Sequence, residues 1–380
     1  MRKVKIDFLI RALDHGGAER QLLVLAEGLS KCGYSVRIIV VYSCGHYMRE
    51  AVERRLEVVS LERNGRWGLF AALVKLLTLW RSGPPDLIHS YMSLANIVTV
   101  LLKPLHQCKI IWGIRSSDLD RMNYGLLSKI SSKVEACLSR FADVIVANSY
   151  AGLDYCANAG FACKNTHVIW NGIEVQKWRR ETSDAVSLRK SLSILETDVV
   201  LGIIGRIDRV KGHVNVLEAM RILQDRGKRI IILIVGDGDA CYLKALMESA
   251  DALNIHSSCR WLPAQSDMIP VYSAIDCIIS ASFSEGFSNV LAEAMACGVV
   301  PIATDVGDSR HIVGDHGWVI RPNSSIAIAD AVDESLAGQS DGANRRVKIR
   351  QHIVEKFDVS VLVSKTETVI RGLLELPGAR

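Results

Sequence analysis

Short apolar stretches recur along the chain, and between them lie longer segments in which apolar residues follow the spacing of a helix. The stretch at residues 4–10 is followed by a glycine-containing turn and a helical pattern over residues 18–31. Further strand-like stretches occupy residues 36–41, 56–61, 87–91, 110–114, 144–147 and 167–170. Strands that alternate with helices, and that are apolar throughout, predict a parallel sheet covered by helices on both faces.

The same pattern begins again at residues 199–205, which indicates a second unit of the same kind. Its further strand-like stretches occupy residues 230–235, 260–262, 277–281, 299–304 and 317–320. We therefore predict an α/β fold with two facing Rossmann-like domains, each a doubly wound parallel sheet. Ligands bind at the carboxyl ends of the strands in such folds, so we expect one interdomain cleft to hold them.

The length of 380 residues agrees with two domains, because a single core rarely grows that large. We place the first domain at residues 1–173 and the second at residues 174–358, with the polar stretch 174–198 as the linker. Residues 359–380 hold a last apolar stretch that predicts a helix. Whether this helix crosses back to the first domain stays open at this point.

Charge is distributed unevenly between the two halves. Residues 1–172 carry 22 Lys and Arg against 14 Asp and Glu, whereas residues 173–380 carry 24 against 27. A basic half suggests an anionic partner or the anionic inner face of a membrane. Nucleic acid is the weaker interpretation, because no dense run of Lys and Arg occurs.

Several cellular settings are disfavoured by the sequence. The ten cysteines show no C-x2-C spacing, so we expect reduced thiols rather than a disulfide framework or a zinc site. Charges in the first seven residues disfavour a signal peptide. The longest apolar run, residues 69–79, is interrupted by Lys75 and is far shorter than the roughly 20 residues that span a bilayer. We expect a cytoplasmic protein that is soluble or lies on the membrane surface.

The densest chemical signal lies at residues 282–298, where an apolar strand, a glycine-containing turn and a helix follow one another. Ser288 and Asn289 are good N-cap residues, and the start of a helix is an anion site. Glu285 lies in the turn and Glu293 in the helix, and a carboxylate can accept two hydrogen bonds from the vicinal hydroxyls of a sugar. Each glutamate alone would be a solvated residue, but their placement in an otherwise apolar segment favours a nucleotide-sugar site.

Two further turns follow the first strand of each unit. In the second unit, Arg206 and Lys211 are suited to clamp a diphosphate, with a solvated basic loop as the alternative. In the first unit, Gly16 and Gly17 permit close approach of a ligand, although a tight turn explains them equally simply. The segment 235–241 resembles a dinucleotide-binding loop, but Cys241 stands where the third glycine belongs, so we predict no NAD site there.

Together these segments resemble the family-4 retaining glycosyltransferases, which have the B-type fold of two Rossmann-like domains. The resemblance rests on the Glu285-x7-Glu293 segment, the turn with Arg206 and Lys211, residues 168–173 and the Gly16-Gly17-Ala18-Glu19-Arg20 loop. It implies transfer of a sugar, with retention of its anomeric configuration, from a nucleotide diphosphate sugar, most often a UDP-sugar. It also implies that neither a metal nor a separate cofactor takes part.

The resemblance assigns a role to each matching residue. Arg206 and Lys211 would bind the diphosphate, Glu285 would lie near the donor sugar, and Glu293 would bind the ribose. The phosphate-facing turn would consist of Gly286, Phe287, Ser288, Asn289 and Val290. The glycine loop of the first domain would supply Gly16 and Gly17. The wall that holds the base would include Leu262.

One position departs from the family pattern. Where many members have a His-Asp pair after the fifth strand, this chain has Arg115. Relatives that act on polysaccharide, lipopolysaccharide or lipid-linked acceptors show a similar Arg together with a stretch like His89-Ser90…Ala95-Asn96. Arg cannot act as a base near neutral pH, so Arg115 would hold an acceptor or a developing charge. For His89, an acceptor contact and a structural role are equally good interpretations.

The sequence thus predicts a hexosyltransferase that works by front-face displacement, with the donor bound mainly by the second domain and a glycan or lipid-linked acceptor by the first. Two alternatives remain: a nucleotide-sugar epimerase of the same architecture and a non-catalytic sensor of sugar nucleotides. Contact with an anionic membrane and an ordinary solvated basic face are equally good interpretations of the basic side chains. These are Lys103, Lys109, Arg121, Lys129, Lys133 and Arg140.

Overall fold

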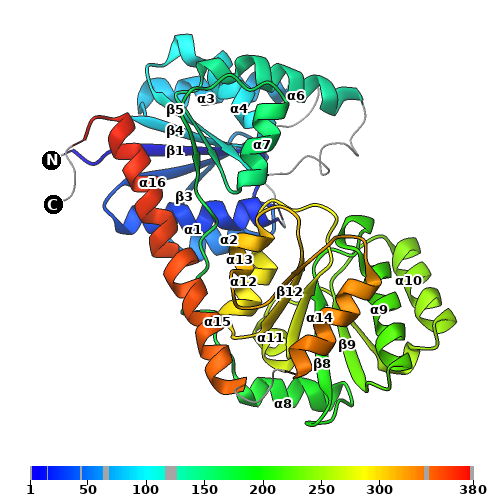
Figure 1. The fold of residues 1–380 in the computed structure, drawn as a ribbon. Helices are drawn as coiled ribbons and strands as arrows, with labels where there is room; N and C mark the ends of the chain where they lie inside the picture. The colour runs from blue at the N-terminus through cyan, green and yellow to red at the C-terminus, as the bar shows by residue number, and fades with distance from the viewer. Residues whose placement is uncertain are drawn as a thin grey trace. The chain divides into compact units, whose positions relative to one another are not determined.

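The computed structural model describes residues 2–14, 16–42, 45–62, 68–115, 126–337 and 342–376, and the chain folds into two compact units (Figure 1). Unit 1 comprises residues 1–172 together with residues 359–380, and unit 2 comprises residues 173–358. Each unit is a parallel sheet covered by helices on both faces, so the predicted pair of Rossmann-like domains is confirmed.

Unit 1 contains a seven-stranded parallel sheet in the order β3-β2-β1-β4-β5-β6-β7. Its strands are β1 Lys5–Ile10, β2 Ser35–Val40, β3 Glu57–Ser60, β4 Leu87–Tyr91, β5 Lys109–Ile114, β6 Val144–Ala147 and β7 Thr166–Val168. The central strands are buried along almost their whole length, which explains their continuous apolar sequence.

Helices of unit 1 cover both faces of this sheet. They are α1 Gly17–Lys31, α2 Met48–Glu53, α3 Gly68–Ser82, α4 Met92–Leu101, α6 Leu126–Leu138, α7 Tyr150–Asn158 and α16 Val359–Leu373, with short 3₁₀ helices η1 Lys103–Leu105 and η2 Ser139–Phe141. One face packs against α1, α2 and α16, and the other against α3, α4 and α7. Each helix buries an apolar stripe and leaves its polar side outside.

The C-terminal helix α16 packs against α1. Gly28 of α1 makes this close approach feasible, because a Cβ atom there would lie 2.3 Å from Cγ2 of Val363. The chain leaves unit 1 after Gly172, and a Cβ atom at Gly172 would lie 2.9 Å from Leu362 of α16. Gln21 of α1 also holds Gly172, donating to its carbonyl and accepting from its N–H, both at 2.9 Å.

Unit 2 contains a six-stranded parallel sheet in the order β10-β9-β8-β11-β12-β13. The strands are β8 Val199–Ile204, β9 Ile230–Val235, β10 Cys259–Leu262, β11 Cys277–Ser280, β12 Val300–Thr304 and β13 Trp318–Ile320. Its helices are α8 Thr182–Ser191, α9 His213–Asp225, α10 Ala240–Ala252, α11 Ile269–Ala274, α12 Asn289–Ala296, α13 Ser309–Val313, α14 Ser325–Ala337 and α15 Gly342–Phe357, with η3 Arg209–Lys211 and η4 His256–Ser258.

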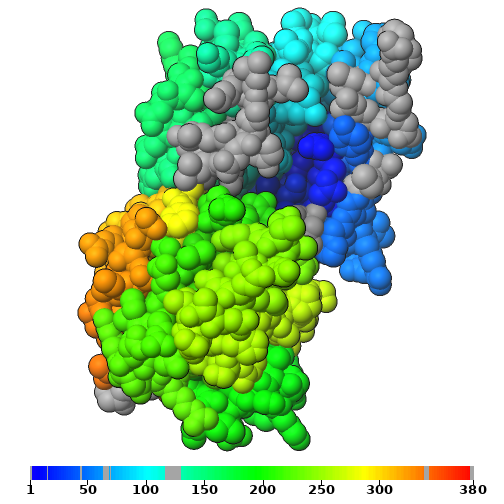
Figure 2. Space-filling view, turned by 90° about the vertical axis from the view of Figure 1, so that its right-hand side faces the viewer, coloured from blue at the N-terminus to red at the C-terminus, as the bar shows by residue number. Residues whose placement is uncertain are grey.

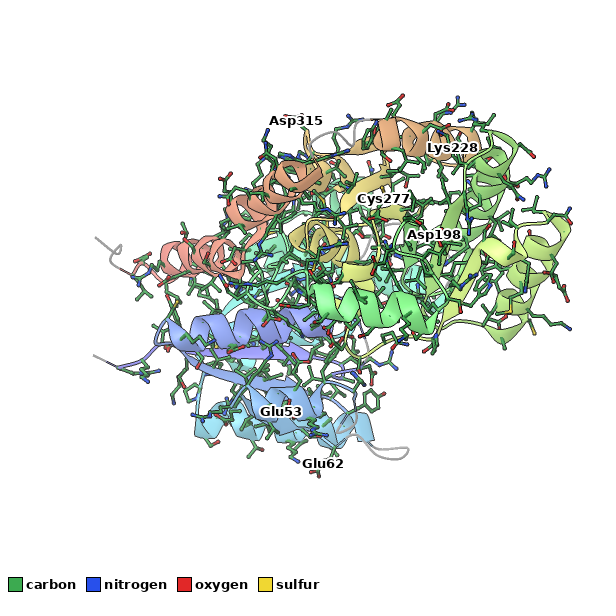
Figure 3. All side chains as sticks on the ribbon, turned by 90° about the horizontal axis from the view of Figure 1, so that it is seen from below. Glu53, Glu62, Asp198, Lys228, Cys277 and Asp315 are labelled. Atoms are coloured by element: carbon green, nitrogen blue, oxygen red, sulfur yellow. The ribbon has the colours of Figure 1, made fainter. Side chains whose placement is uncertain are left out.

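One face of the unit 2 sheet packs against α9, α10 and α14. Cys277, at the start of β11, is buried in this core, whereas Lys228 lies at the surface (Figure 3). Helix α10 lies on the outside of the unit and forms part of the yellow-green surface in Figure 2. Its two fully buried side chains, Leu246 and Ala250, point to the core.

The prediction of a linker at residues 174–198 is wrong. This stretch belongs to unit 2 and contains α8, which packs against α11. Trp178 and Ile194 are buried, and Arg189 forms an ion pair of 2.9 Å with Asp276 while donating to the carbonyl of Ala274. These tertiary contacts stabilise a segment whose own composition is too polar to indicate a packed helix.

The strand order reverses once in each sheet. In unit 1 the reversal lies between β1 and β4, and in unit 2 it lies between β8 and β11. The loops after such neighbouring strands diverge to opposite faces and leave a crevice at the carboxyl edge, where ligands bind in doubly wound sheets. These two switch points are therefore the places where candidate ligand contacts are expected. No helix within the described ranges is long and apolar enough to span a bilayer.

Candidate functional site

The switch point of unit 2 brings together the two loops that hold most of the predicted donor-binding residues. The loop after β8 contains Arg206 and Lys211, and the loop after β11 contains Glu285. Gly212 has a φ of 69°, and a Cβ atom there would lie 2.1 Å from the carbonyl oxygen of Ala281. Glycine is thus required where the two loops touch, because any side chain would collide with the backbone of the other loop.

A lysine and a glutamate meet across this contact. Lys211 Nζ donates to Oε1 of Glu285, and the same oxygen accepts a hydrogen bond of 2.8 Å from Ser282 Oγ. The side chains are 27% and 14% exposed for Lys211 and Glu285, so the pair is shielded but reachable from solvent. Thr304 at the end of β12 donates to the carbonyl of Ser282 at 2.6 Å and so fixes the turn.

Arg206 lies on the exposed side of the same loop. Its side chain is 67% exposed, and its Nε donates to Oδ2 of Asp208. The other oxygen of Asp208 accepts from the backbone N–H of Lys211 at 3.2 Å and caps η3. One carboxylate therefore holds both the side chain of Arg206 and the turn that presents Lys211. Sequence reasoning missed Asp208, although an acid between two bases in a short loop is a visible signal.

The predicted phosphate-facing turn leads into α12, whose first-turn N–H groups and dipole favour an anion. Ser288 is the N-cap, and its Oγ accepts from the N–H of Leu291 at 3.5 Å. Phe287 points into the protein, because its side chain is buried and its ring packs 5.5 Å from that of Phe357. At this position only the backbone is available to a ligand, whereas Gly286, Asn289 and Val290 remain partly exposed.

Glu293 lies one turn further along α12 and is only 2% exposed. Its Oε2 accepts a hydrogen bond of 2.9 Å from the hydroxyl of Tyr272 on α11, and the Tyr272 ring packs against Trp178. The alternative of a solvated surface glutamate is therefore wrong. Tyr272 was missed, because nothing in the sequence links two helices 21 residues apart.

The loops after β8, β9 and β10 form one packed wall. A Cβ atom at Gly236 would lie 1.9 Å from the carbonyl oxygen of Gly205, and the N–H of Gly236 donates to the carbonyl of Leu262 at 3.0 Å. Asp237 accepts from the N–H of Ala264 at 3.1 Å. The glycines of segment 235–241 thus allow backbone to pack on backbone. Leu262 lies at the end of β10, where the resemblance places the base wall, and is partly exposed.

In unit 1, the loop after β1 ends at Gly16, the N-cap of α1, and Gly17 is the first residue of the helix. The carboxylate of Glu19 folds back over this end, since a Cβ atom at Gly16 would lie 2.1 Å from Glu19 Oε2. Burial raises the pKa of Glu19, and the nearby Asp14 raises it further. The helix start therefore already holds a carboxylate of its own chain.

Arg115 follows β5 at the carboxyl edge of the same sheet. Its Nη2 donates to the hydroxyl of Tyr91 at 2.7 Å, and its Nη1 donates to Oδ1 of Asn171 at 3.3 Å. The guanidinium also stacks on the Tyr91 ring, with Cζ 4.5 Å from the ring centroid. Two other segments of unit 1, at Tyr91 and at Asn171, thus contact this arginine, which remains partly exposed.

His89 lies beneath this cluster and is 1% exposed, between the rings of Phe8 and Tyr91. Burial, followed by the charge of Arg115, lowers the pKa of His89 well below its usual value, so the imidazole is neutral at physiological pH. Within the described ranges neither ring nitrogen has a hydrogen-bond partner. This burial favours the structural interpretation of His89 over direct contact with an acceptor.

The remainder of the His89-Ser90…Ala95-Asn96 stretch forms an internal network. Ser90 Oγ donates to Asn96 Oδ1 at 2.7 Å, and Asn96 Nδ2 donates to the buried carboxylate of Glu135 at 2.8 Å. Ser93 donates to the other oxygen of Glu135 at 2.5 Å. The network ties α4 to α6. Residues 116–118, which follow Arg115 in the departing motif, lie outside the described residues.

The described residues include no group of three or more His, Cys, Asp and Glu side chains placed to hold a metal ion. The unit 2 switch point instead offers two basic side chains, a helix start and a carboxylate within adjoining loops. Such an arrangement is suited to bind an anionic group beside a polar, hydroxyl-rich one.

Comparison with known sequences agrees with this chemistry. Residues 185–354 match the family described as glycosyl transferases group 1, and residues 15–177 match glycosyltransferase family 4. The N-acetyl-alpha-D-glucosaminyl L-malate synthase of Bacillus anthracis is 26% identical over 237 residues, which are 61% of this chain and 60% of that enzyme. The D-inositol 3-phosphate glycosyltransferase of Corynebacterium urealyticum is 27% identical over 355 residues, which are 85% of this chain and 83% of that protein.

Solved structures share the fold. HepE of Anabaena in complex with UDP superposes with a TM-score of 0.86 at 21% identity, over 97% of this chain and 100% of that one. Its complex with UDP-glucose gives a TM-score of 0.84 over 97% of this chain and 99% of that one.

Proposed function

We propose that this chain, which belongs to the family-4 glycosyltransferases, transfers a sugar from a UDP-sugar to a cell-envelope polysaccharide, lipopolysaccharide or lipid-linked acceptor. Unit 2 binds the donor and unit 1 binds the acceptor. The transfer retains the anomeric configuration and needs no metal. The choice of a UDP-sugar is supported by the Anabaena relative, which has been crystallised with UDP and with UDP-glucose.

The contact between Lys211 and Glu285 carries this proposal. It places a cation and a carboxylate together where the strand order of unit 2 reverses, with the start of α12 following the same loop. A nucleotide diphosphate sugar presents a doubly charged diphosphate next to a ring of hydroxyl groups. Lys211, Arg206 and the α12 start bind the diphosphate, and Glu285 accepts hydrogen bonds from the sugar hydroxyls.

Catalysis follows from where charge develops. As the bond between the sugar and the diphosphate breaks, negative charge grows on the leaving diphosphate. Arg206, Lys211 and the N–H groups after Glu285 stabilise that charge, and such electrostatic stabilisation is usually the largest part of a rate enhancement. The acceptor hydroxyl attacks from the same face that the diphosphate leaves and passes its proton to the leaving phosphate oxygen, so the configuration is retained. No residue here needs to form a covalent bond to the sugar.

A membrane location suits a lipid-linked acceptor. Helix α6 and the following η2 expose apolar side chains at Ile130, Val134 and Phe141, with Lys133 and Arg140 exposed between them. A surface with alternating apolar and basic side chains would bind an anionic leaflet. Each basic residue would contribute about 1 kcal/mol to the free energy of membrane binding. Lys103 contributes less, because its amine is bound to Asp143 at 3.1 Å.

Two of the other basic residues expected on this surface, Arg121 and the side chain of Lys129, lie outside the described residues. Sedimentation with vesicles tests the membrane location. Binding to anionic lipid that falls with salt would support it, and absence of binding at low salt would contradict it.

The function is tested with labelled UDP-sugars and a cell-envelope extract as acceptor. Arg206→Ala should lower both donor affinity and the rate of transfer. The matched control is Arg229→Ala, which removes an arginine of unit 2 that is 80% exposed and lies far from β8's carboxyl end, and it should leave both unchanged. Unchanged turnover and donor affinity in Arg206→Ala would contradict the proposed donor site.

The same experiment separates the alternative functions. An epimerase would convert the UDP-sugar without any acceptor, whereas a transferase shows only slow hydrolysis in that case. A sensor would bind the donor in a titration but transfer nothing to any acceptor. A panel of UDP-, GDP- and ADP-sugars, read by thermal shift, identifies the base, because a ligand that binds only the folded state raises the melting temperature.

A further inference from the structure

We infer that Tyr150 and Trp170 form a platform for a sugar ring of the acceptor, at the carboxyl edge of the unit 1 sheet. The inference rests on the proposed function in one respect, since it assigns this sugar ring to the acceptor. It narrows the acceptor to a glycan with more than one sugar unit. One unit receives the transferred sugar, and another packs on the platform.

The platform lies in a row of loops that follow neighbouring strands. Arg115 follows β5, Tyr150 begins α7 after β6, and Trp170 follows β7. These three strands are adjacent in the sheet and lie progressively further from the switch point between β1 and β4. Asn171, the residue after Trp170, accepts a hydrogen bond of 3.3 Å from Arg115 Nη1, so the row is continuous. A glycan that begins near the switch point can therefore extend along this row.

The ring of Tyr150 is open to solvent. Its side chain is 49% exposed, although the first residue of a helix has no need of an aromatic side chain. The buried side of α7 consists of Gly152, Tyr155 and Cys156, so Tyr150 lies on the other side of the helix. A single exposed aromatic residue is common on protein surfaces, and the inference therefore depends on a second ring beside it.

Trp170 supplies that second ring. It packs edge-to-face with Tyr150, with the ring centroids 6.0 Å apart and 71° between the ring planes. Lys365 of α16 lies over the Trp170 ring, with Nζ 4.9 Å from the ring centroid. Trp170 is partly exposed and Lys365 is exposed. Both rings are thus held in place before a ligand binds, which lowers the entropic cost of binding.

The chemistry around the Tyr150 ring selects the ligand class. Asp154, four residues later on the same side of α7, is exposed and places a carboxylate beside the ring. A phosphoryl group would be repelled by this carboxylate and by the negative face of the aromatic ring. A lipid chain would cover the carboxylate and the phenol hydroxyl without forming hydrogen bonds to them. A sugar ring fits both groups, because its C–H groups pack on the aromatic face while its hydroxyls donate to Asp154.

The test is affinity electrophoresis of the full chain through gels that contain lipid-free glycans, released by mild acid from the cell-envelope extract. We expect these glycans to retard wild type. Tyr150→Ala should weaken the binding about five- to tenfold, and Trp170→Ala, which removes the support of the Tyr150 ring, about threefold. Tyr150→Phe keeps the ring and should bind within about twofold of wild type.

The matched control is Phe70→Ala. Phe70 is 68% exposed on α3, which follows β3 at the opposite edge of the same sheet, and its loss should leave glycan binding unchanged. Equal melting temperatures of the variants and wild type show that each is folded. Absence of wild-type binding to the lipid-free glycans, or equal binding by Tyr150→Ala and wild type, overturns the inference.

A second arm separates the sugar from the lipid of a lipid-linked acceptor. Here the same glycans, still linked to lipid, are carried in phosphatidylcholine vesicles, and binding is read by sedimentation. Binding that depends on Tyr150 in both arms supports a site for a sugar ring. Binding that depends on Tyr150 only in the vesicle arm would show that the platform holds the lipid chain, which overturns the inference.

Failure of the proposed function gives a different result, because neither binding arm contains a donor. Glycan binding that depends on Tyr150, without any transfer from labelled UDP-sugars, would contradict the proposed function and still support the platform. Where transfer occurs, Tyr150→Ala should raise KM for the glycan about fivefold, with kcat and UDP affinity almost unchanged. An unchanged KM for the glycan would overturn the inference and leave the proposed function in place.

Discussion

The switch points of the two units differ in how their basic side chains are held. In unit 2, Lys211 contacts Glu285 and Arg206 contacts Asp208, so each cation has a carboxylate partner. In unit 1, Arg115 donates to a phenol and to an amide oxygen, and no carboxylate within the described residues pairs with it. The same sheet topology therefore supports two different electrostatic arrangements.

The difference bears on how each unit would receive an anion. In unit 2, an incoming diphosphate must share or replace the carboxylate partners of Lys211 and Arg206. Weakening these ion pairs offsets part of the free energy that the diphosphate gains by binding the two cations. Glu285 then becomes available to the sugar, which links diphosphate binding to sugar binding. In unit 1, Arg115 has no carboxylate partner to exchange among the residues that the structure describes. We expect the unit 2 cations to govern catalysis and the unit 1 cation to govern which acceptor is bound.

The largest effect is expected for Lys211→Gln. Removal of this charge takes away one of the groups that stabilise the leaving diphosphate and leaves Glu285 without its lysine. Loss of one such donor typically lowers the rate about 10²–10³-fold, and we expect a fall of that order in kcat/KM for the UDP-sugar. Steady-state kinetics measures it, together with UDP affinity from calorimetric titration.

Lys244→Gln is the control for this prediction. Lys244 lies on the exposed side of α10 in the same unit, and its side chain is 77% exposed beside Glu248. Its loss should change kcat/KM by less than about twofold, because exposed pairs contribute little. Equal kinetics for the two variants would contradict the assignment of Lys211 to the donor site.

Much of the fold follows from the sequence, because buried parallel strands need continuous apolar residues. The strands at Leu87–Tyr91 and Val144–Ala147 have the predicted bounds, and α1 begins one residue earlier than predicted. Helix α8 could not be predicted in the same way. It is stabilised by contacts with distant residues, such as the ion pair between Arg189 and Asp276, rather than by its own apolar pattern.

The candidate site follows from the sequence only in part. Motif spacing identifies Arg206, Lys211 and Glu285 as candidates, but the direct contact of the last two spans 74 residues and depends on β8 lying next to β11. The role of Ser282 could not be predicted from the sequence, because its hydroxyl contributes only by donating a hydrogen bond to Glu285 in the folded turn. The inward orientation of Phe287 likewise depends on Phe357, at the end of α15, which no local pattern indicates.

A second, smaller effect concerns the neutral histidine beneath Arg115. Burial depresses the pKa of His89 in the folded state, so the unfolded state binds more protons below its own pKa of about 6.5. The stability that this neutral histidine contributes is present above that pH and is lost as the pH falls. The loss should reach at most about 1.4 kcal/mol per pH unit. His89→Phe, which can pack between Phe8 and Tyr91, should remove this part of the acid sensitivity.

Urea unfolding of wild type and His89→Phe at pH 7 and pH 5 measures that difference. His256→Gln is the control, since His256 is 76% exposed and should leave the pH dependence unchanged. If His89→Phe lost as much stability as wild type between the two pH values, then His89 would not be the buried neutral base that the structure shows. His89 would then be protonated and would place a second positive charge beside Arg115.

The smallest effect is expected for Ser282→Ala, which tests how firmly Glu285 must be held. The hydroxyl of Ser282 donates to Oε1 of Glu285 at 2.8 Å, the same oxygen that accepts from Lys211. Without it, Glu285 keeps its ion pair but is less restricted in orientation, and one net hydrogen bond of about 1 kcal/mol is lost. We expect kcat/KM to fall about fivefold with UDP affinity almost unchanged, because the hydroxyl orients the carboxylate that contacts the sugar.

Ser282→Thr restores the hydroxyl and should recover most of the rate. A loss of UDP affinity equal to the loss of kcat/KM would instead show that Ser282 positions the residues that bind the diphosphate, Lys211 and Arg206, and not Glu285 alone.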